Sequence, residues 1–337
     1  MPAIPDTMRA VQLRAYDGKP ESIAVAKIPV PLPGPGQVLV RVAASPINPS
    51  DIMFVRGLYG FKKPLPAIAG FEGSGTVVEC GSGIMARLLK GRRVACHAAD
   101  PKITGGMWAE FLVTSAQACV PLRRNVEIEQ AASMLVNPLS AWAMMSEVRR
   151  GRHRALVQTA AASALGRMLI RLGRKFDVPT INVVRRAEQV QLLRDLGAEH
   201  VLDSSAPDFD ANLRHLCRKL RATIAFDAVA GEMSARVLHA QPRGSRLLVY
   251  GALSLRAVEA DPGSLIFEGK QMEGFWLSAW LGKKNMLSRL RIARRVQKLL
   301  SVELKTDIRA RFPLEDVGRA LQEYAVHMTG GKILLVP

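Results

Sequence analysis

The fold of this chain is decided by the stretch RALVQTAAASALGRMLIRLGRKFDVPTINVVRRAEQVQLLRDLGAEHVLD, residues 154–203. An apolar strand ends near Gln158, small residues follow, a helix starts near Gly166, and a second strand ends at Val184. A strand, a tight turn, a helix and a second strand make the βαβ unit of a parallel sheet. The pattern therefore predicts an α/β fold with a doubly wound parallel sheet, continued by the strand-like runs TIAFDAV and RLLVYGA.

The turn after the first strand predicts a dinucleotide site, although its sequence is unusual. In a doubly wound sheet this turn brings the pyrophosphate to the N-terminus of the helix, where N–H groups and the helix dipole favour negative charge. Glycines usually fill the turn, but residues 160–164 are AAASA and only Gly166 remains. An Ala held in the left-handed conformation costs about 1 kcal/mol. An ordinary strand–helix contact is the alternative, and the surrounding βαβ unit favours the cofactor.

The end of the second strand indicates which cofactor binds. An NAD site places Asp or Glu there for the ribose hydroxyls, whereas Arg accommodates a 2′-phosphate. This chain has Arg185 and Arg186. Glu188 is close, but it fits the first turn of the next helix, where a carboxylate complements the dipole. The residues favour NADPH, and two ordinary surface arginines are the alternative.

Outside this unit the predicted pattern of strands and helices changes twice along the chain. Residues 1–125 consist of short strands and turns, strand–helix alternation runs from about 131 to about 279, and the tail supplies two helices and the closing strand KILLVP. We therefore expect a β-rich domain over 1–130, completed by 280–337, and a cofactor-binding domain over 131–279.

Charge and hydropathy limit the possible partners. The net charge of +18 and the pI near 10.4 imply a field that attracts polyanions. Part of it lies in GKKNMLSRLRIARRVQKLL, 282–300, where the spacing predicts a helix with a basic solvent face. Nucleic acid is a partner that we do not favour, because no known binding motif accompanies the charge. No apolar run reaches the ~20 residues of a membrane span, and the N-terminus lacks the order of a signal peptide, so we expect a cytosolic protein with reduced thiols.

Several motifs together resemble the medium-chain dehydrogenase/reductase superfamily over essentially the whole chain. They are NPSDI, AGFEGSGTVVECG, GGMWAEFLV and VNPLSAWAMM, followed by the βαβ unit. The order is most similar to the zinc-free branch, which contains the mitochondrial-type trans-2-enoyl thioester reductases and their quinone oxidoreductase relatives. The resemblance implies a GroES-like catalytic domain, a Rossmann domain that binds NADPH, and a homodimer.

Two positions argue against the zinc chemistry of other superfamily members. Those members carry a cysteine in the loop that corresponds to NPSD and a histidine in a Gly-His-Glu segment. This sequence has Asn48 and Phe71 there, and it lacks the four clustered cysteines of the structural zinc lobe. Neither side chain replaces a thiolate or imidazole ligand, so we expect no metal site.

Without a metal, reduction of a polarised carbon–carbon double bond is the natural reaction. Hydride addition to the β-carbon produces an enolate, which must be stabilised and protonated. Tyr59, in NPSDIMFVRGLYG, matches the catalytic tyrosine of the enoyl thioester reductases in its distance after NPSD. A half-buried loop aromatic is the alternative. We expect Ser50 and Asp51 to cap a helix that begins at Ile52.

The remaining site residues follow from the turn and strand end described above and from the resemblance. For Asn137, the alternative to cofactor binding is a role in a turn or a helix cap. For the stretch that begins at Tyr250, it is the end of a strand, and for Trp276 it is a contact in the core or in a dimer interface. The predicted cofactor-binding residues are Asn48, Asn137, Ser140, Ala162, Ser163, Ala164, Leu165, Gly166, Arg185, Arg186, Tyr250, Gly251, Ala252, Leu253, Phe275, Trp276, Leu277 and Lys332.

The sequence thus predicts an NADPH-dependent, zinc-independent reductase of α,β-unsaturated carbonyl compounds. Enoyl thioesters are the favoured substrates, and Tyr59 is the expected proton donor. A quinone or small-enone reductase is the first alternative. A weakly catalytic protein that binds a cofactor or RNA is the second, motivated by the glycine-poor turn and the positive charge.

Overall fold

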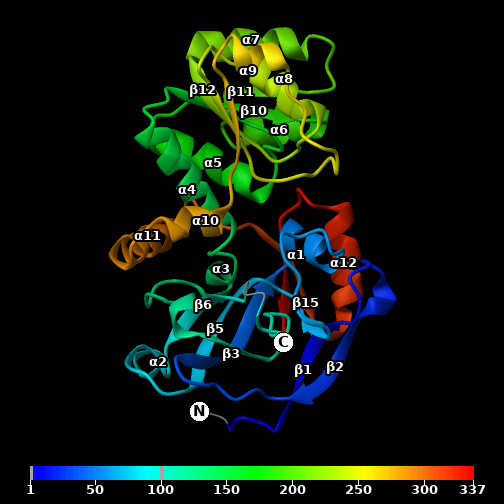
Figure 1. Cartoon of the computed structure of the whole chain (residues 1–337), viewed down its shortest axis with the longest axis vertical. Coiled ribbons are helices and arrows are strands. Elements are labelled where there is room, and N and C mark those ends of the chain that lie inside the picture. Colours follow the sequence, from blue (N-terminus) through cyan, green and yellow to red (C-terminus); the bar gives the residue numbers. More distant parts are fainter. Residues whose placement is uncertain (1–2, 99–101) are drawn as a thin grey trace. The chain divides into compact units, whose positions relative to one another are not determined.

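The computed structural model describes residues 3–98 and 102–337 and contains two compact units (Figure 1). Unit 1 consists of Met1–Asn137 together with Ala293–Pro337, and unit 2 consists of Pro138–Ile292. The chain therefore leaves unit 1, builds unit 2 and then returns to complete the unit in which it began.

Unit 1 is built mainly of strands, and the sequence predicted short strands and turns over residues 1–125. Its strands are β1 (Thr7–Leu13), β2 (Ile23–Pro29), β3 (Gln37–Pro46), β4 (Ala67–Ile68), β5 (Glu72–Cys80), β6 (Arg93–His97), β7 (Phe111–Ser115), β8 (Cys119–Pro121), β15 (Ile308–Pro313) and β16 (Lys332–Val336). Its helices and 3₁₀ turns are η1 (Pro20–Ser22), α1 (Pro49–Val55), α2 (Ile84–Leu89), η2 (Ala116–Ala118), α3 (Ile128–Ala132), η3 (Leu314–Asp316) and α12 (Val317–Val326).

The two sequence segments that make up unit 1 pair in one sheet. Its strand order is β15-β16-β3-β5-β6-β8, and β7 also pairs with β3. The C-terminal strand β16 runs antiparallel to β3, where Leu334 faces Pro46, and this pairing brings the red end of the chain beside blue β3 in Figure 1. A smaller sheet has the order β2-β1-β4.

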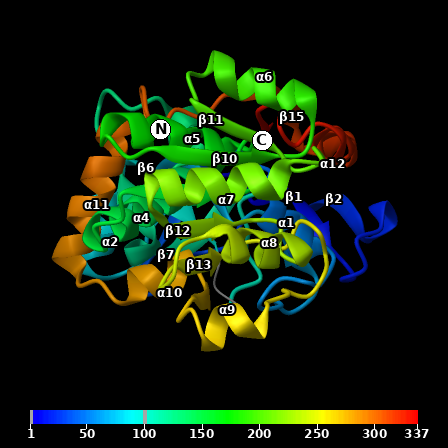
Figure 2. The same cartoon turned by 90° about the horizontal axis from the view of Figure 1, so that it is seen from above.

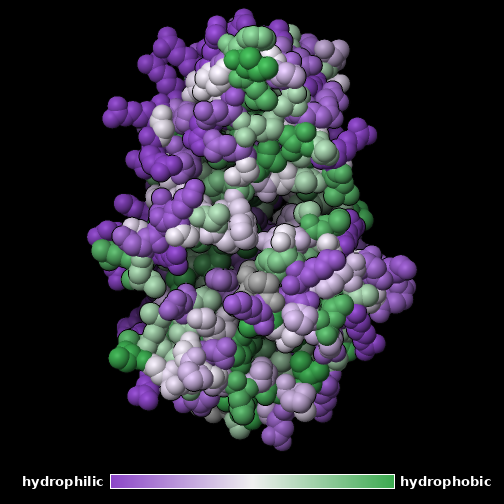
Figure 3. Space-filling view, in the orientation of Figure 1, coloured by the Kyte–Doolittle hydropathy of each residue, from purple (hydrophilic) through white to green (hydrophobic). Residues whose placement is uncertain are grey.

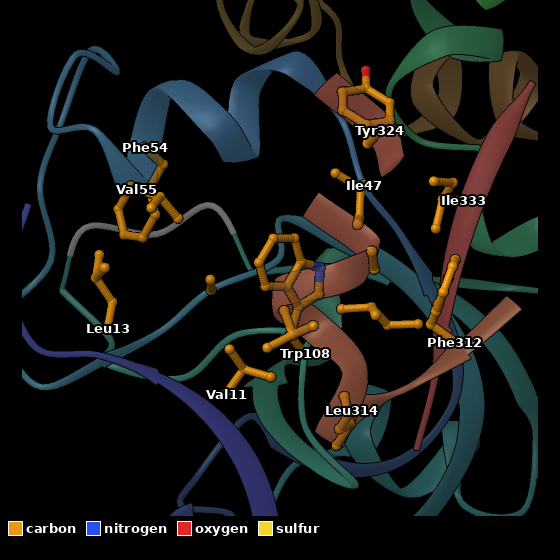
Figure 4. Close-up of a cluster of buried hydrophobic side chains, with 14 of the residues drawn as sticks. Val11, Leu13, Ile47, Phe54, Val55, Trp108, Phe312, Leu314, Tyr324 and Ile333 are labelled. Atoms are coloured by element: carbon orange, nitrogen blue, oxygen red, sulfur yellow. The ribbon is translucent and has the colours of Figure 1, made fainter. Parts of the chain in front are cut away.

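A buried tryptophan forms the centre of the core of unit 1. Trp108 is fully buried among Val11, Leu13 and Ile47, and side chains from α12 and β15 close the cluster (Figure 4). Gly70 has a φ of +89°, and a Cβ atom there would lie 2.4 Å from the Trp108 ring. The indole therefore fits only because position 70 has no side chain.

Unit 2 alternates strands and helices, as the sequence predicts. Its elements are α4 (Asn137–Arg150), β9 (Ala155–Gln158), α5 (Ala164–Lys175), β10 (Thr180–Val184), α6 (Ala187–Asp195), β11 (His200–Asp203), α7 (Phe209–Leu220), β12 (Ala222–Asp227), α8 (Glu232–Ala240), β13 (Arg246–Val249), α9 (Pro262–Ile266), β14 (Gln271–Gly274) and α10 (Leu277–Gly282), followed by α11 (Met286–Leu299), with which the chain returns to unit 1.

The sheet of unit 2 is a doubly wound Rossmann sheet, which confirms the predicted fold class. All its neighbouring strands are parallel, in the order β11-β10-β9-β12-β13-β14. Residues of α7 and α8 form one buried cluster with the strands, and residues of α5 and α6 form another. Figure 2, which views this unit from above, shows α6 beside β11. The strand order reverses between β9 and β12, the place where such sheets bind nucleotides.

Within the described part of the chain, no helix combines the length and apolar character that crossing a bilayer requires.

Candidate active site

The catalytic candidate Tyr59 lies in the segment that follows α1 in unit 1. This helix begins at Pro49, not at Ile52 as the sequence suggested, because a proline fits the first helical position, where no N–H bond is needed. Asn48 is the residue before the helix, and its backbone N–H donates to the Asp51 carboxylate at 2.8 Å. Ser50 lies inside the helix and does not cap it, whereas Asp51 takes part in the cap from the third helical position, so the expected helix start was placed three residues too late.

The ring of Tyr59 packs in a group of aromatic side chains. It contacts Phe61 edge-on with the ring centroids 5.1 Å apart, and it lies tilted against Phe71 at 4.7 Å. Phe54 continues the group at 5.1 Å from Phe71. The phenol is half-buried, so its apolar edge is held by other rings while the residue keeps some exposure.

The segment that holds Phe71 is fixed by buried carboxylates. The Phe71 N–H donates to Asp51 Oδ1 at 3.0 Å. The next residue, Glu72, is fully buried and accepts hydrogen bonds from Asn48 Nδ2 and from the N–H groups of Leu135 and Val136, each at 2.9 Å. Glu72 therefore joins the start of α1 to the strand β5 and to the segment that leads to Asn137.

A buried lysine from the opposite end of the chain completes this network. The Lys332 ammonium donates to the Ile47 carbonyl at 3.0 Å and to Asn48 Oδ1. The side chains of Asn48, Asp51, Glu72 and Lys332 are all at least 98% buried. We call these four residues the buried polar cluster. If all its groups were ionised, it would hold two carboxylates and one ammonium.

Burial decides the protonation of these groups. Burial raises the pKa of Asp51 to about 6, whereas the hydrogen bonds from Asn48 and the charge of Lys332 lower it. Burial likewise raises the pKa of Glu72, while Lys332 and the Asn48 amide oppose the shift. Burial lowers the pKa of Lys332, and the two carboxylates oppose it. Each charge is thus expensive to bury and depends on the others.

The predicted site residues of unit 1 therefore fall into one region. The structure brings Asn48 and Lys332 into direct contact, and Tyr59 is linked to the same cluster through Phe71. Asn137, which is largely buried, follows the segment bound by Glu72. Sequence reasoning missed Glu72, although a carboxylate in the apolar run AGFEGSG is a signal of a buried, paired charge. The cofactor contacts of Asn48, Asn137 and Lys332 stay predictions.

In unit 2, the turn between β9 and α5 that the sequence predicts to bind phosphate is made of small residues. Ala160 adopts a positive φ of 48°, the conformation that glycine usually supplies. Ser163 caps α5, because its hydroxyl accepts the Gly166 N–H at 3.1 Å. A Cβ atom at position 166 would lie 2.3 Å from the Ala161 carbonyl, so only glycine lets the helix approach the turn. The first N–H groups of α5, at Ala164 and Leu165, have no intrahelical acceptor.

The two predicted arginines follow the next strand, β10. Both side chains are exposed, and Arg186 pairs with Glu188 at 3.1 Å. Glu188 lies in the first turn of α6, as expected. Of these two arginines, Arg185 is the one for which no ion pair is recorded within the described residues.

A second missed carboxylate lies at the end of β12. Asp227 is fully buried and accepts hydrogen bonds from the Thr159 hydroxyl at 2.6 Å and the Ser234 hydroxyl at 2.5 Å. The N–H groups of Val229 and Ala230 bond to it as well. Asp227 thereby fixes the turns after β9 and β12, the two strands that flank the reversal of strand order.

The stretch from Tyr250 follows β13 and begins at a buried hydroxyl. The Tyr250 N–H donates to the Asp227 carbonyl at 2.8 Å. Its hydroxyl oxygen is buried, and within the described part of the chain it has no hydrogen-bond partner. Burial, and then the charge of Asp227, raises its pKa. Gly251 lies against Ala228, where a Cβ atom would come within 2.8 Å of a carbonyl oxygen, whereas Leu253 is exposed.

The last predicted segment follows the edge strand β14. The Phe275 N–H donates to the Val249 carbonyl at 2.8 Å, and Trp276 precedes α10 with 56% of its surface exposed. Trp280, four residues on, donates its indole N–H to Glu147 at 2.7 Å. In this chain Trp276 is therefore not a core residue. Ser140 and Leu277 lie in α4 and α10, and Ala252 lies after β13.

These features fit a dinucleotide in unit 2. The turn at residues 160–164 has side chains no larger than Ser, the first N–H groups of α5 have no intrahelical acceptor, and two arginines follow the next strand. The unpartnered Tyr250 hydroxyl is a buried polar group that a ligand would satisfy. In residues 3–98 and 102–337, no group of three or more His, Cys, Asp or Glu side chains is placed to hold a metal ion.

Two protein families match this chain. The alcohol dehydrogenase GroES-like domain matches residues 34–124, and the family described as zinc-binding dehydrogenase matches residues 164–291. A mitochondrial enoyl-[acyl-carrier-protein] reductase of Xenopus tropicalis is 30% identical over 90% of this chain and 88% of its own length. The protein of the same name from Mus musculus is 33% identical over 74% of this chain and 66% of its own.

Solved structures agree with these matches. A putative NADPH:quinone reductase from Mesorhizobium loti is 37% identical, with a TM-score of 0.91 over the whole of both chains. Another from Bacillus thuringiensis is 26% identical, with a TM-score of 0.88 over 98% of this chain and 99% of its own. The chain belongs to the medium-chain dehydrogenase/reductase superfamily. Within it, the protein is an oxidoreductase of the enoyl reductase and quinone oxidoreductase type, as the motifs predicted.

Proposed function

We propose that this NADPH-dependent oxidoreductase reduces the carbon–carbon double bond of enoyl thioesters, with Tyr59 as the proton donor. The observation that carries the proposal is the setting of Tyr59, whose ring is held against Phe71 while Phe71 is itself fixed by the buried carboxylate of Asp51. A phenol held in a defined orientation is suited to proton transfer, because it keeps its proton at neutral pH.

The chemistry divides between the cofactor and the chain. When bound, NADPH supplies a hydride to the β-carbon of the substrate. Tyr59 donates a hydrogen bond to the thioester oxygen, where negative charge develops, and its proton is delivered to the α-carbon. The phenolate then regains a proton from water, so the double bond gains one hydride and one proton in total.

The predicted cofactor residues are assigned as follows. The N-terminus of α5 and the turn before it, residues 160–166, would hold the pyrophosphate. Arg185 and Arg186 would pair with the 2′-phosphate. The stretches 250–253 and 275–277 follow β13 and β14 and would face the nicotinamide end. Asn48, Asn137, Ser140 and Lys332 complete the proposed set.

The proposed reaction uses no zinc. The two positions at which zinc-dependent relatives carry a cysteine and a histidine are Asn48 and Phe71 here. Asn48 bridges Glu72 and Lys332, and Phe71 supports Tyr59. Both side chains thus have packing or hydrogen-bonding roles, and neither is a thiolate or imidazole.

Quinone reduction is the second candidate, favoured by the similarity to putative NADPH:quinone reductases from two bacteria. It keeps the cofactor and the fold but requires no α-carbon proton from Tyr59. The two candidates therefore differ in how strongly activity depends on the Tyr59 hydroxyl.

The test is NADPH oxidation by the purified protein with crotonyl-coenzyme A and, separately, with a quinone. Tyr59→Phe is compared with Tyr16→Phe, because Tyr16 lies in the same aromatic group but bonds its hydroxyl to the backbone of Lys63 at 2.8 Å. We expect crotonyl-coenzyme A reduction to fall about 100-fold or more in Tyr59→Phe only. Equal rates in wild type and Tyr59→Phe would refute the proton-donor role. Quinone turnover without thioester turnover would favour the second candidate, and RNA binding without NADPH binding would favour neither.

We further propose a homodimer formed through β14. This strand ends the sheet of unit 2, and three of its four residues are exposed. An exposed edge strand is a template for pairing with a second copy. Sedimentation of the 36.7 kDa chain as a monomer at micromolar concentration would contradict the proposal.

A further inference from the structure

Two of the four cysteines face each other across neighbouring strands of unit 1. The strands β6 and β8 pair antiparallel, and Cys96 lies directly opposite Cys119. Both side chains belong to one buried cluster, in which Cys96 has no exposed surface and Cys119 keeps 8%. The proposed reaction uses neither thiol.

The pairing of β6 and β8 brings these two side chains close together. Val94 faces Pro121, and because Pro121 has no N–H group, this pair cannot exchange both backbone hydrogen bonds. Hydrogen-bonded and non-hydrogen-bonded pairs alternate in an antiparallel ladder, and Cys96 and Cys119 lie two steps further along. They therefore form a non-hydrogen-bonded pair, in which Cα atoms are about 4.5 Å apart and side chains approach most closely. Disulfides join Cα atoms that are roughly 4.4–6.8 Å apart, so the backbone fits one.

The two thiols already interact. Cys96 is hydrogen-bonded to the Cys119 side chain, and its sulfur also lies 3.8 Å from the sulfur of Met107. The Cys119 thiol donates to the Ser115 carbonyl at 3.6 Å. The hydrogen bond with Cys119, followed by burial, raises the pKa of the Cys96 thiol well above its usual value. Cys96 therefore keeps its proton at neutral pH and is the weaker nucleophile of the two.

Small molecules can approach Cys119 from the surface. The strand β8 ends the strand order of its sheet and has only three residues, and short edge strands open more easily than central ones. A surface pocket is lined by Ser115, which bonds to Cys119, and by the exposed side chains of Ile84 and Met85 in α2. Figure 3 shows hydrophobic residues at the position that α2 has in Figure 1.

The other two cysteines lack this arrangement. Cys217 is fully buried in α7 of unit 2, and burial raises its pKa to about 12. Cys80 lies at the end of β5, opposite Val38. The pair in β6 and β8 is therefore distinguished by both its register and its hydrogen bond.

We propose that Cys96 and Cys119 form a reversible disulfide when the protein meets hydrogen peroxide. The Cys119 thiolate attacks one peroxide oxygen, the O–O bond breaks, and a sulfenic acid and hydroxide form. The Cys96 sulfur then attacks the Cys119 sulfur, the S–O bond breaks, and a second hydroxide leaves. The two thiol protons convert both hydroxides to water, so two thiols are oxidised and one peroxide is reduced. A dithiol reductant reverses the reaction by exchange.

The test is peroxide treatment of the folded full-length protein. Remaining thiols are then alkylated in denaturant, and the peptides are mapped by mass without reductant. The variants are Cys96→Ala and Cys119→Ala. The matched control is Cys217→Ala, which removes an equally buried thiol from unit 2.

In the wild type we expect a linked pair of peptides that contains Cys96 and Cys119. It should form about 10-fold or more faster than Cys217 is oxidised, and dithiothreitol should release it. Cys217→Ala should behave as the wild type. Cys96→Ala should stop at the sulfenic acid of Cys119, which dimedone traps, whereas Cys119→Ala should leave Cys96 reduced.

The wild type alone can overturn the proposal, so the result does not depend on how well the variants fold. Four free thiols after treatment, a disulfide that includes Cys80 or Cys217, or a disulfide between two copies of the chain would each do so. Oxidation of Cys96 and Cys217 at the same rate would also overturn it. The assay contains neither NADPH nor a thioester, so its outcome is independent of the proposed function.

Discussion

Replacing Lys332 by Met is the sharpest test of the buried polar cluster. The ammonium is 98% buried, donates to the Ile47 carbonyl and to Asn48, and is the cation that offsets the charges of Glu72 and Asp51. Methionine keeps much of the volume of the chain but removes the charge. The two buried carboxylates are then left without their cation.

The magnitude follows from the cost of an uncompensated buried charge. Removing one partner of a buried ion pair typically destabilises a protein by about 3–5 kcal/mol. At about 2–4 °C per kcal/mol for a unit of this size, the melting temperature should fall by roughly 6–20 °C at pH 8.

The stability lost in Lys332→Met should be larger at high pH than at low pH. The folded-state pKa values of Asp51 and Glu72 are raised, so the stability that these groups contribute is present at low pH and is lost as pH rises through the folded pKa. At pH 5 both carboxyls are largely protonated and need no cation. The destabilisation by Lys332→Met should therefore shrink by at least half between pH 8 and pH 5.

The assay is calorimetry of wild type, Lys332→Met and Lys332→Met/Glu72→Gln at both pH values. The double variant removes one of the two orphaned charges and should recover part of the lost stability at pH 8. Lys270→Met is the control, since Lys270 is equally buried but its partner Glu268, at 2.6 Å, is 42% exposed and is hydrated after the change. A loss in Lys332→Met that is the same at pH 5 and pH 8, or that Glu72→Gln increases, would refute this reasoning.

Further predictions concern the cofactor turn and the choice of cofactor. Gly166→Ala should weaken NADPH binding and destabilise the fold by about 1–3 kcal/mol. The control Gly318→Ala, with nothing within 4 Å of the new Cβ, should be neutral or stabilising. Equal effects of the two variants in thermal melts would argue against the close approach of α5 to the turn. Ala160→Gly should raise stability by about 0.5 kcal/mol in denaturant titrations, because the residue has a φ of 48°. Arg185→Ala/Arg186→Ala should raise KM for NADPH about 10-fold and leave KM for NADH within about 2-fold, and parallel changes for both cofactors would contradict a 2′-phosphate site.

Local patterns predicted the cofactor-binding fold well. The first strand ends at Gln158 and the second at Val184, as the sequence indicated, because strand ends were marked by the change from apolar to small or charged residues. The helix begins at Ala164, two residues before the expected start. Its beginning is set by the Ser163 cap, a local signal that the focus on Gly166 obscured.

Local sequence patterns could not predict the contacts within the buried polar cluster. Asn48 and Lys332 were each predicted to contact the cofactor, but their mutual contact joins positions 284 residues apart. No periodicity reports such a contact, because it arises only when the C-terminal strand pairs with β3. The apolar run around Glu72 is a local signal of a buried charge, but its partners could not be predicted, since they come from the start of α1 and from the segment before α4.

The glycine-poor turn shows which physical requirement the usual motif expresses. Of the positions where glycine is expected, only position 166 needs it for space, because any Cβ there would meet the Ala161 carbonyl at 2.3 Å. Position 160 needs a positive φ, which Ala adopts at the cost of some stability. The other positions need only small side chains and a helix cap, which alanine and Ser163 provide. A count of glycines therefore underestimates how closely this turn meets the spatial requirements of the usual motif. The pattern of small residues that ends in Gly166 describes those requirements better.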